Sequence, residues 1–513
     1  MRLGVVATAL VVVACTGTPP ETTSTAATSR TVAPTTTTTA AAATTSSTPQ
    51  EGSGTGVLSV WDGDRALLTV PLDRDNPDGP TIEVPVRRHP AEDPERRVGV
   101  LLVNPGGPGF PAGDLVANAE DIYSPALRAA FDIVAIDPRG TFPSTKVDCG
   151  SGLAEYFSAV DFSPDTDEEV VILTDHIEAS VEACEADNPG LLEHISTMDS
   201  VHDMAVLVDA LGEDQVSWFG FSYGTILGAA FATAYPDLVR AAVFDGAYYP
   251  YGYGDPLEEA LVDAEAQEEL LLRLIGECEA DAACPVDGSP LAALVRVSER
   301  SDVDPYDDDP DLPAVNQGAL IFTTLAGFHA YGAPSAQFWA AIAAADAGDG
   351  APLQRYFSQT AEFQGSGGST LPINCIDYPS RGEPPLSPEA LPQLEAAAPT
   401  LYEVFPTPEG FEDVVIPGDC DLWPAGPDLL PIPLSGDGAG PVLIVTATGD
   451  PVTPEGSAAL LADDLVDETV LVVEDDQHVS YDRFGPPARR CAADVIDAFL
   501  IDLTVPVDTT CEG

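Results

Sequence analysis

One serine in the sequence lies in a pattern typical of an enzymatic nucleophile. The motif Gly220-Phe221-Ser222-Tyr223-Gly224 follows an apolar run that predicts a strand, and a helical pattern comes after it. A sharp strand-to-helix turn of the form Gly-X-Ser-X-Gly lifts the serine hydroxyl above the edge of a sheet. A hydroxyl becomes a good nucleophile only when a neighbouring base takes its proton. The motif therefore predicts acyl transfer at Ser222, assisted by a base and an acid from elsewhere in the chain.

Among the six histidines, His478 is the candidate base because it follows the last predicted strand. Asp450 lies in the loop after the preceding strand, so the residues occur in the order serine, acid, histidine that this kind of α/β sheet requires. Asp450 would accept the imidazole N–H and stabilise the imidazolium formed during attack. We expect a helix to begin just after this loop, with Thr453 as its cap and Pro454 in its first turn. Ser222, Asp450 and His478 are the predicted catalytic triad.

The oxygen of the attacked carbonyl becomes negatively charged and needs two N–H donors. One predicted donor is the amide of Tyr223, directly after the nucleophile. The other is expected in the loop Asn104–Gly109 (NPGGPG), where we favour the amide of Gly107. Glycines there allow the backbone to approach the substrate without a side chain in the way. A tight turn without catalytic donors is the alternative interpretation.

Short apolar runs separated by helical patterns predict the elements that position these residues. Because the runs lack clear alternation, we expect a mostly parallel sheet with helices on both faces, an α/β architecture. Strands are expected at 98–103, 131–136, 216–219, 241–244, 442–445 and 470–473, after an antiparallel hairpin or meander over 56–88. Between 248 and 440 helical patterns replace the strands, at 256–278, 290–297, 317–331 and 336–347. Such an insertion before the acid predicts a helical cap over the carboxyl edge of the sheet, where α/β proteins bind ligands.

The N-terminus has the pattern of an exported chain. Arg2 precedes an apolar run that ends at Ala14, and Cys15 follows, which resembles a bacterial lipobox. We predict a lipoprotein signal peptide over 1–14 and lipidation of Cys15, with an ordinary signal peptide as the alternative. The Thr/Ser/Pro-rich stretch 15–54 predicts a disordered tether. The rest divides into a first core part over 55–250, a cap over 251–435 and a second core part over 436–513. We expect the protein to lie outside the cytoplasm, either anchored by its lipid to the outer face of the cell membrane or released.

Charge and cysteine usage narrow the classes of partner. The 84 acidic and 20 basic residues give a net charge of −64. Such a surface repels phosphate backbones, so no nucleic-acid partner is expected. Eight cysteines besides Cys15 are typical of disulfides in an exported chain. Eight cysteines allow many pairings, and among them we select the one in sequence order (149–184, 278–284, 375–420, 491–511). Since none of them forms a Cys-X-X-Cys pair, no metal site is expected, and no cofactor is predicted.

Several ordered motifs resemble the secreted bacterial tripeptidyl aminopeptidase family, serine exopeptidases of the α/β-hydrolase fold related to prolyl aminopeptidases. They are NPGGPG at 104–109, DPRG at 137–140, GFSYGT at 220–225, YPDLVRAAVFDGAYYP at 235–250 and, in a segment similar to that family's C-terminal region, TGDPVTP with Gln477-His478, Cys491 and Cys511. The resemblance covers nearly everything after the tether. It implies an α/β-hydrolase fold and the release of short peptides, often tripeptides, from free N-termini. The chain departs from the family at Phe110-Pro111 and at Gln477 and Val479, where small residues or glycine are common, and these departures affect the pocket rather than the triad.

An aminopeptidase must bind a positively charged amine, for which a rigid carboxylate is suited. Asp377 is our candidate, because a disulfide at the nearby Cys375 would hold it in place, and an ordinary acidic loop residue is the alternative. The same triad would also serve a carboxylesterase or lipase acting on small or acyl esters, and the fold alone does not separate these activities. A non-catalytic binding protein is disfavoured because no triad member is missing. The expected partner is a peptide or small ester, and the sequence predicts no oligomeric state.

Overall fold

The computed structural model describes residues 56–141, 145, 147, 149, 153–164, 166–250, 255–365, 370–377, 390–406, 420, 423, 428–507 and 509–513. The predicted signal peptide, Cys15 and the whole of the predicted tether lie outside these residues. All triad candidates, both oxyanion candidates and Asp377 lie within them.

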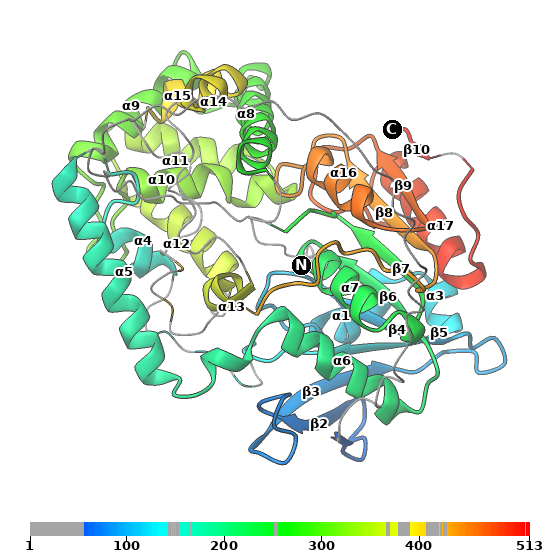
Figure 1. The fold of residues 1–513 in the computed structure, drawn as a ribbon. Helices are drawn as coiled ribbons and strands as arrows, with labels where there is room; N and C mark the ends of the chain where they lie inside the picture. Colours follow the sequence, from blue (N-terminus) through cyan, green and yellow to red (C-terminus); the bar gives the residue numbers. More distant parts are fainter. Residues whose placement is uncertain are drawn as a thin grey trace, which may run out of the picture.

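Ten strands form one sheet (Figure 1). They are β1 (Val57–Leu58), β2 (Arg65–Pro71), β3 (Thr81–His89), β4 (Gly99–Asn104), β5 (Phe131–Ile136), β6 (Val216–Phe221), β7 (Val239–Asp245), β8 (Val442–Ala447), β9 (Glu468–Val473) and β10 (Thr510–Cys511). Their order is β1-β2-β3-β5-β4-β6-β7-β8-β9-β10, antiparallel as far as β5 and parallel beyond it. The strands β4, β6 and β8 are buried along their whole length, which explains why their sequences do not alternate. All six predicted core strands are present.

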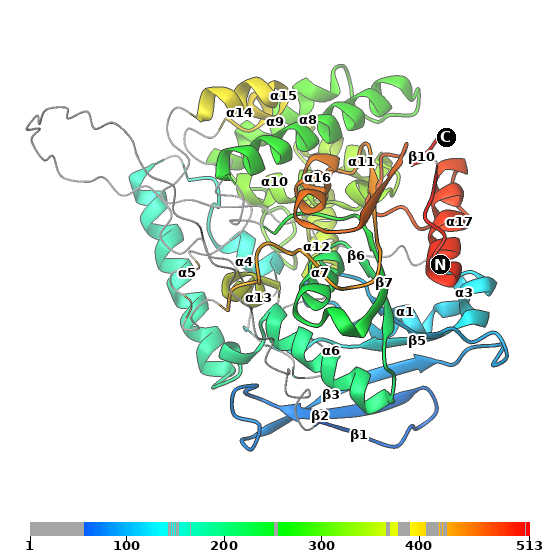
Figure 2. The same ribbon diagram turned by 45° about the vertical axis from the view of Figure 1, so that its right-hand side comes forward.

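Helices cover both faces of this sheet, as predicted (Figure 2). One face packs against α6 (Thr197–Leu211), α7 (Tyr223–Ala234) and α16 (Glu455–Asp464). The other packs against α1 (Gly113–Ala117), α2 (Ala119–Ile122), α3 (Pro125–Ala130) and α17 (Pro487–Asp502). Short 3-10 turns, η1 (Leu192–His194) and η2 (Pro236–Leu238), precede α6 and β7. The mostly parallel sheet between two helical layers is the α/β fold that the sequence predicts.

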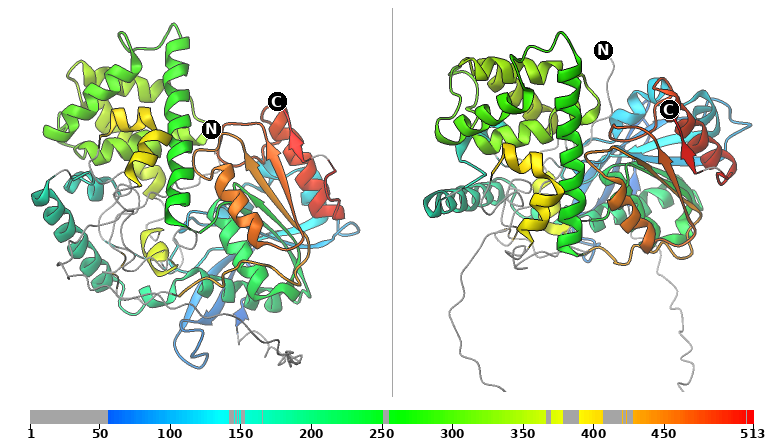
Figure 3. Two further views of the ribbon diagram at one scale, coloured as in Figure 1. Left: turned by 45° about the horizontal axis from the view of Figure 1, so that its top comes forward. Right: turned by 90° about the horizontal axis from the view of Figure 1, so that it is seen from above.

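A second body of helices forms the cap (Figure 3). Between β7 and β8 lie α8 (Pro256–Ala280), α9 (Pro290–Val303), α10 (Gln317–Leu325), η3 (Phe328–Tyr331), α11 (Ala336–Asp346), α12 (Ala351–Gly365), α13 (Thr370–Asp377), α14 (Leu391–Ala397) and α15 (Pro399–Val404). The prediction of one continuous helix over 317–331 is wrong, because the structure has two separate elements there, α10 and η3. Gly327, a poor helix former, lies between them. Among the helices that the structure describes, none combines the length and apolarity that a membrane crossing requires.

The cap is not built from the inserted segment alone. The predicted division placed α4 (Leu153–Ala159) and α5 (Asp167–Asp187) in the first core part, yet their apolar side chains belong to the buried cluster of the cap. Phe157 of α4 stacks on Phe322 of α10, with ring centroids 4.7 Å apart. The segment with α4 and α5 and the segment after β7 therefore share one apolar core. A single boundary at residue 250 between core and cap separates helices that pack together.

Cap and sheet meet at the carboxyl ends of the parallel strands. Arg273 of α8 donates hydrogen bonds to the carbonyls of Gly449 (3.3 Å) and Asp476 (2.9 Å), in the loops after β8 and β9. Thr370 of α13 donates to the carbonyl of Pro108 (2.6 Å), in the loop after β4. The predicted position of the cap is thus confirmed. The predicted order of the disulfides is confirmed as well, with bonds 149–184, 278–284, 375–420 and 491–511.

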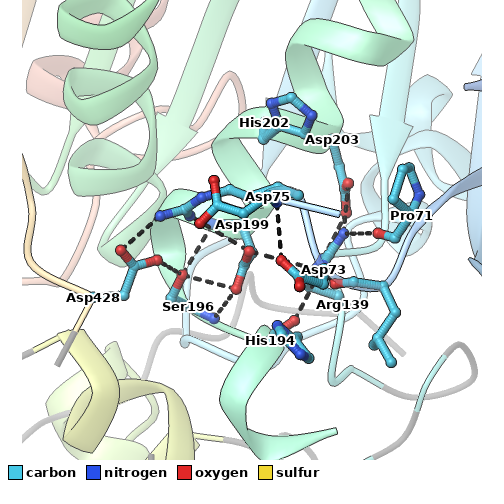
Figure 4. A network of polar contacts seen from close by, with 12 residues as sticks. Pro71, Asp73, Asp75, Arg139, His194, Ser196, Asp199, His202, Asp203 and Asp428 are labelled. Carbon is cyan, nitrogen blue, oxygen red and sulfur yellow. Dashed lines mark hydrogen bonds and ion pairs between the residues drawn. The ribbon is translucent and has the colours of Figure 1, made fainter. Parts of the chain in front are cut away.

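A buried network of charges fixes the start of α6 against the sheet (Figure 4). Arg139, from the DPRG motif, is fully buried and donates to both carboxylate oxygens of Asp203 (2.8 and 2.9 Å) and to three backbone carbonyls. Nearby, Asp428 accepts hydrogen bonds from Arg74 (2.7 Å) and from Ser196 (2.5 Å), the cap of α6. Buried charges are tolerated only when they are paired in this way. Arg139 of the DPRG motif therefore has a structural role: it joins α6 to the end of β2.

Candidate active site

Ser222 occupies the sharp turn between β6 and α7 that the sequence predicts. Its φ of 54° and ψ of −128° lie in a region that residues other than glycine rarely adopt. The turn is held by two backbone hydrogen bonds, from Ser222 N–H to the carbonyl of Asp245 (3.0 Å) and from Thr225 N–H to the carbonyl of Ser222 (2.7 Å). Strain of this kind persists only where the surrounding structure enforces it, and it is concentrated at functional sites.

Asp450 and His478 are brought together from the loops after β8 and β9. The imidazole Nδ1 lies 2.9 Å from Asp450 Oδ2 and 3.1 Å from Oδ1, and both side chains are buried. An ionised carboxylate can only accept hydrogen bonds, so Nδ1 must carry the proton in this pair. That tautomer leaves the Nε2 lone pair of His478 available to accept a proton from an alcohol.

Thr453 contacts both members of this pair, whereas the sequence predicts it as a helix cap. The prediction is wrong because α16 begins at Glu455 with Pro454 as its cap residue. The Thr453 hydroxyl instead donates to Asp450 Oδ2 (2.9 Å) and lies 3.2 Å from His478 Nδ1. Asp450 Oδ1 also accepts the backbone N–H groups of Val452 (2.8 Å) and Thr453 (2.9 Å). The sequence contains one signal for this contact: Thr453 lies three positions after Asp450. Asp side chains commonly accept hydrogen bonds from amides two or three residues ahead, which brings a hydroxyl at that position close to the carboxylate.

The nucleophile turn and the imidazole both lie against the end of β7. Asp245, the last residue of that strand, holds the Ser222 N–H through its carbonyl, and Gly246 comes next. A Cβ atom on Gly246 would lie only 3.1 Å from His478 Cε1 and 3.1 Å from Thr453 Oγ1. The His478 ring therefore lies directly beside Gly246, the residue after the one whose carbonyl binds the Ser222 N–H. The structure brings all three predicted triad residues to one end of the sheet.

Of the two predicted oxyanion donors, Tyr223 directly follows the nucleophile and Gly107 lies in the loop after β4. Tyr223 is the first residue of α7, so its N–H has no acceptor within the helix. The loop after β4 lies against this amide, because a Cβ on Gly106 would lie 3.1 Å from Tyr223 N and 2.9 Å from Ser222 Cβ. The Gly106 N–H already donates to Asn104 Oδ1 (2.8 Å). Of these two neighbouring glycine amides, Gly107 is therefore the better candidate for the second donor.

Substituting Gly106 with alanine should lower kcat on a short-chain ester by about 10²-fold, the effect of losing one oxyanion donor. The new methyl group would lie 2.6 Å from the carbonyl oxygen of Phe221, so the loop must move away from the nucleophile turn. Steady-state kinetics of the purified variant measure the change. Gly113→Ala, at the first residue of α1 just after this loop, is the matched control, since its Cβ would come no closer than 3.4 Å to a neighbour. Equal kinetics for both variants would contradict the assignment.

Asp377 lies at the end of α13 and is fully buried. Its Oδ1 accepts the N–H of Thr197 (2.9 Å) and its Oδ2 accepts the Thr197 hydroxyl (2.5 Å). That hydroxyl also contacts the hydroxyl of Tyr223, so a short polar chain joins the cap to the residue after the nucleophile. Burial raises the pKa of Asp377 to about 8. Burial therefore disfavours the charged carboxylate unless a positive group lies beside it, and the predicted amine-binding role stays a prediction.

The described part of the chain holds no group of three or more His, Cys, Asp or Glu side chains arranged to bind a metal ion.

The family described as alpha/beta hydrolase fold matches residues 99–483, a range that contains Ser222, Asp450 and His478. The Serine protease Hip1 of Mycobacterium tuberculosis is 27% identical over 469 residues, which cover 86% of this chain and 85% of that protein. Carboxylesterase B of Mycobacterium tuberculosis is 30% identical over 461 residues, covering 86% of this chain and 84% of that protein. Tripeptidyl aminopeptidase of Streptomyces lividans is 33% identical over 192 residues, or 36% of this chain and 35% of that protein.

Proposed function

The chain belongs to the α/β-hydrolase family and is a serine hydrolase, and from this premise we propose that it is a secreted aminopeptidase that releases short peptides, tripeptides among them, from free N-termini. The observation that carries the proposal is the buried pair of His478 Nδ1 and Asp450 Oδ2, 2.9 Å apart, at the same end of the sheet as the strained turn at Ser222. The relatives named as a serine protease and a tripeptidyl aminopeptidase favour a peptide substrate.

In the proposed mechanism Ser222 Oγ attacks the scissile carbonyl while His478 Nε2 takes its proton. The amides of Gly107 and Tyr223 stabilise the oxyanion, and Asp450 stabilises the imidazolium. His478 then protonates the leaving amine, which frees the rest of the substrate and leaves an ester of the N-terminal peptide on Ser222. Water attacks this ester with His478 as base again, and the short peptide is released.

Hydrolysis of small or acyl esters is the second candidate activity. It requires the same nucleophile, base and amide donors, and the relative named Carboxylesterase B, 30% identical over 461 residues, supports it. The difference between the two activities lies in the recognition of a free amine, which an esterase does not need.

Three substrates distinguish these activities in one assay of the purified protein: a peptide with a free N-terminus, the same peptide with an acetylated N-terminus, and a short-chain ester. Turnover that requires the free amine supports the aminopeptidase. Turnover of the ester alone supports the esterase. Absence of turnover on all three substrates, for the wild type as for the Ser222→Ala variant, would instead indicate a binding protein.

Replacement of Asp377 with asparagine tests whether this residue binds the substrate amine. We expect KM for free-amine peptides to rise about tenfold, because one charge-assisted hydrogen bond is lost, with kcat/KM on the ester unchanged. Equal losses on both substrates would show that Asp377 supports the site only through its hydrogen bonds to Thr197.

We also propose that the mature chain begins at a lipidated Cys15 and is held outside the cytoplasm by the Thr/Ser/Pro-rich segment that follows. A Cys15→Ala variant should then be released into the medium instead of sedimenting with membranes. Intact-mass measurement of the N-terminal peptide of the wild type checks the acyl group directly.

A further inference from the structure

The loop that carries His478 contains a strained residue. Val479 has φ of 60°, in the left-handed region, where a β-branched side chain is a genuine outlier. Such a backbone is kept only when neighbouring groups enforce it. The groups that enforce it here come from the end of β7, which precedes Val479 in the sequence by more than two hundred residues.

Asp245 makes three hydrogen bonds that connect this loop to the nucleophile turn. Its carboxylate is fully buried and accepts the N–H of Ser480 at Oδ1 (2.8 Å) and the N–H of Tyr481 at Oδ2 (2.8 Å). Its backbone carbonyl accepts the N–H of Ser222 (3.0 Å). Asp245 therefore binds both the turn that carries Ser222 and the loop that carries His478.

The next residue completes the arrangement. Gly246 has no side chain, and a Cβ there would lie 3.0 Å from Val479 Cγ1 and 3.1 Å from His478 Cε1. The loop is thus packed directly against the backbone at the end of β7. Burial raises the pKa of Asp245 to about 6, while its two amide donors and the nearby His478 and Arg489 oppose this rise.

We propose that Asp245 is a positioning residue: its carboxylate holds Val479 in the left-handed conformation and so keeps the His478 imidazole at the distance from Ser222 that proton transfer requires. The proposal rests on the proposed triad. Asp245 touches neither the substrate nor the reacting atoms, so its effect should appear in the rate of chemistry and not in substrate binding.

The test uses the rate at which a fluorophosphonate reacts with Ser222, which depends on proton transfer to His478 and needs no peptide recognition. Four variants are compared: Asp245→Asn, Val479→Gly, the double variant, and Asp161→Asn. Asp161 is the matched control, because its carboxylate is also mostly buried and also accepts backbone N–H groups, from Ser163 (2.9 Å) and Gly318 (3.1 Å), but within the cap. Circular dichroism and thermal unfolding establish that each variant is folded.

We expect Asp245→Asn to slow labelling and kcat by about 10²-fold with KM unchanged, since a displacement of about 1 Å costs a rate of that order. Val479→Gly should remain within about threefold of the wild type, because glycine adopts this backbone without strain. The double variant should be faster than Asp245→Asn by at least about fivefold, since the glycine lessens the need for the carboxylate. Asp161→Asn should label like the wild type.

The proposal is overturned if Asp245→Asn labels at the wild-type rate, or if the double variant is no faster than Asp245→Asn. If Asp245→Asn does not fold, a folded and active double variant supports the proposal, whereas failure of both to fold assigns Asp245 to folding and overturns it. Ser222→Ala separates this result from the triad itself: if that variant still reacts with the fluorophosphonate, the proposed function fails whatever the Asp245 variants do.

Discussion

Replacing Ser222 with alanine should lower kcat on every substrate of this protein by about 10⁶-fold, the scale of losing a triad nucleophile. The reason is that Ser222 is the residue placed at the strained strand-to-helix turn, with the imidazole of His478 at the same end of the sheet. Hydrolysis of a short-chain ester, followed by absorbance, measures the loss. Substrate KM should change little, because the hydroxyl contributes to the transition state rather than to ground-state binding.

Ser217→Ala is the matched control for that experiment. Ser217 lies on β6, the strand that leads to Ser222, and is equally buried, and its hydroxyl accepts a hydrogen bond from Arg240 (3.1 Å) on β7. The control should keep wild-type kinetics at a small cost in stability of about 1 kcal/mol, the value of one hydrogen bond. If Ser222→Ala kept more than a small fraction of the activity, another nucleophile would be responsible and the triad would be wrong.

Replacing Asp450 with asparagine should lower kcat by about 10⁴-fold, because it selects the wrong tautomer of the imidazole. Asp450 Oδ1 accepts the backbone N–H groups of Val452 and Thr453, so the carbonyl oxygen of an asparagine must take that position. Its NH₂ group then faces His478 Nδ1 and acts as a donor, where the carboxylate was an acceptor. Nδ1 becomes the acceptor, Nε2 carries the proton, and the base can no longer accept one from Ser222.

The prediction for Asp450 has its own control in Asp464→Asn. That carboxylate ends α16 and accepts hydrogen bonds from Tyr249 (3.2 Å) and from the N–H of Leu434 (3.2 Å), away from His478. It should retain wild-type kcat. The two variants should remain folded by circular dichroism, and near-equal kcat values for them would show that the acid of the triad is another residue.

Some features were predictable because they depend on short stretches of chain. The turn at Ser222 needs only a strand, a Gly-X-Ser-X-Gly motif and a helix, all within about twenty residues. The core strands followed from apolar runs, since strands covered on both faces, such as β4, β6 and β8, do not alternate between apolar and polar residues. Asp450 and His478 followed from their places after consecutive strands, because parallel strands bring their carboxyl ends to the same edge.

Sequence alone thus determined the fold class and the three triad candidates, whereas the pairing of the cysteines in sequence order was one choice among many, which the tertiary structure bears out. Only the tertiary structure decided that α4 and α5 belong to the cap, that Thr453 serves the Asp450–His478 pair, and that Asp245 binds the loop after His478. The physical reason is that periodicity and turn chemistry act over neighbouring residues, whereas a buried polar group selects its partner by distance and direction across the folded chain. The partners of Asp245 lie 235 and 236 residues away, and no local pattern encodes that choice.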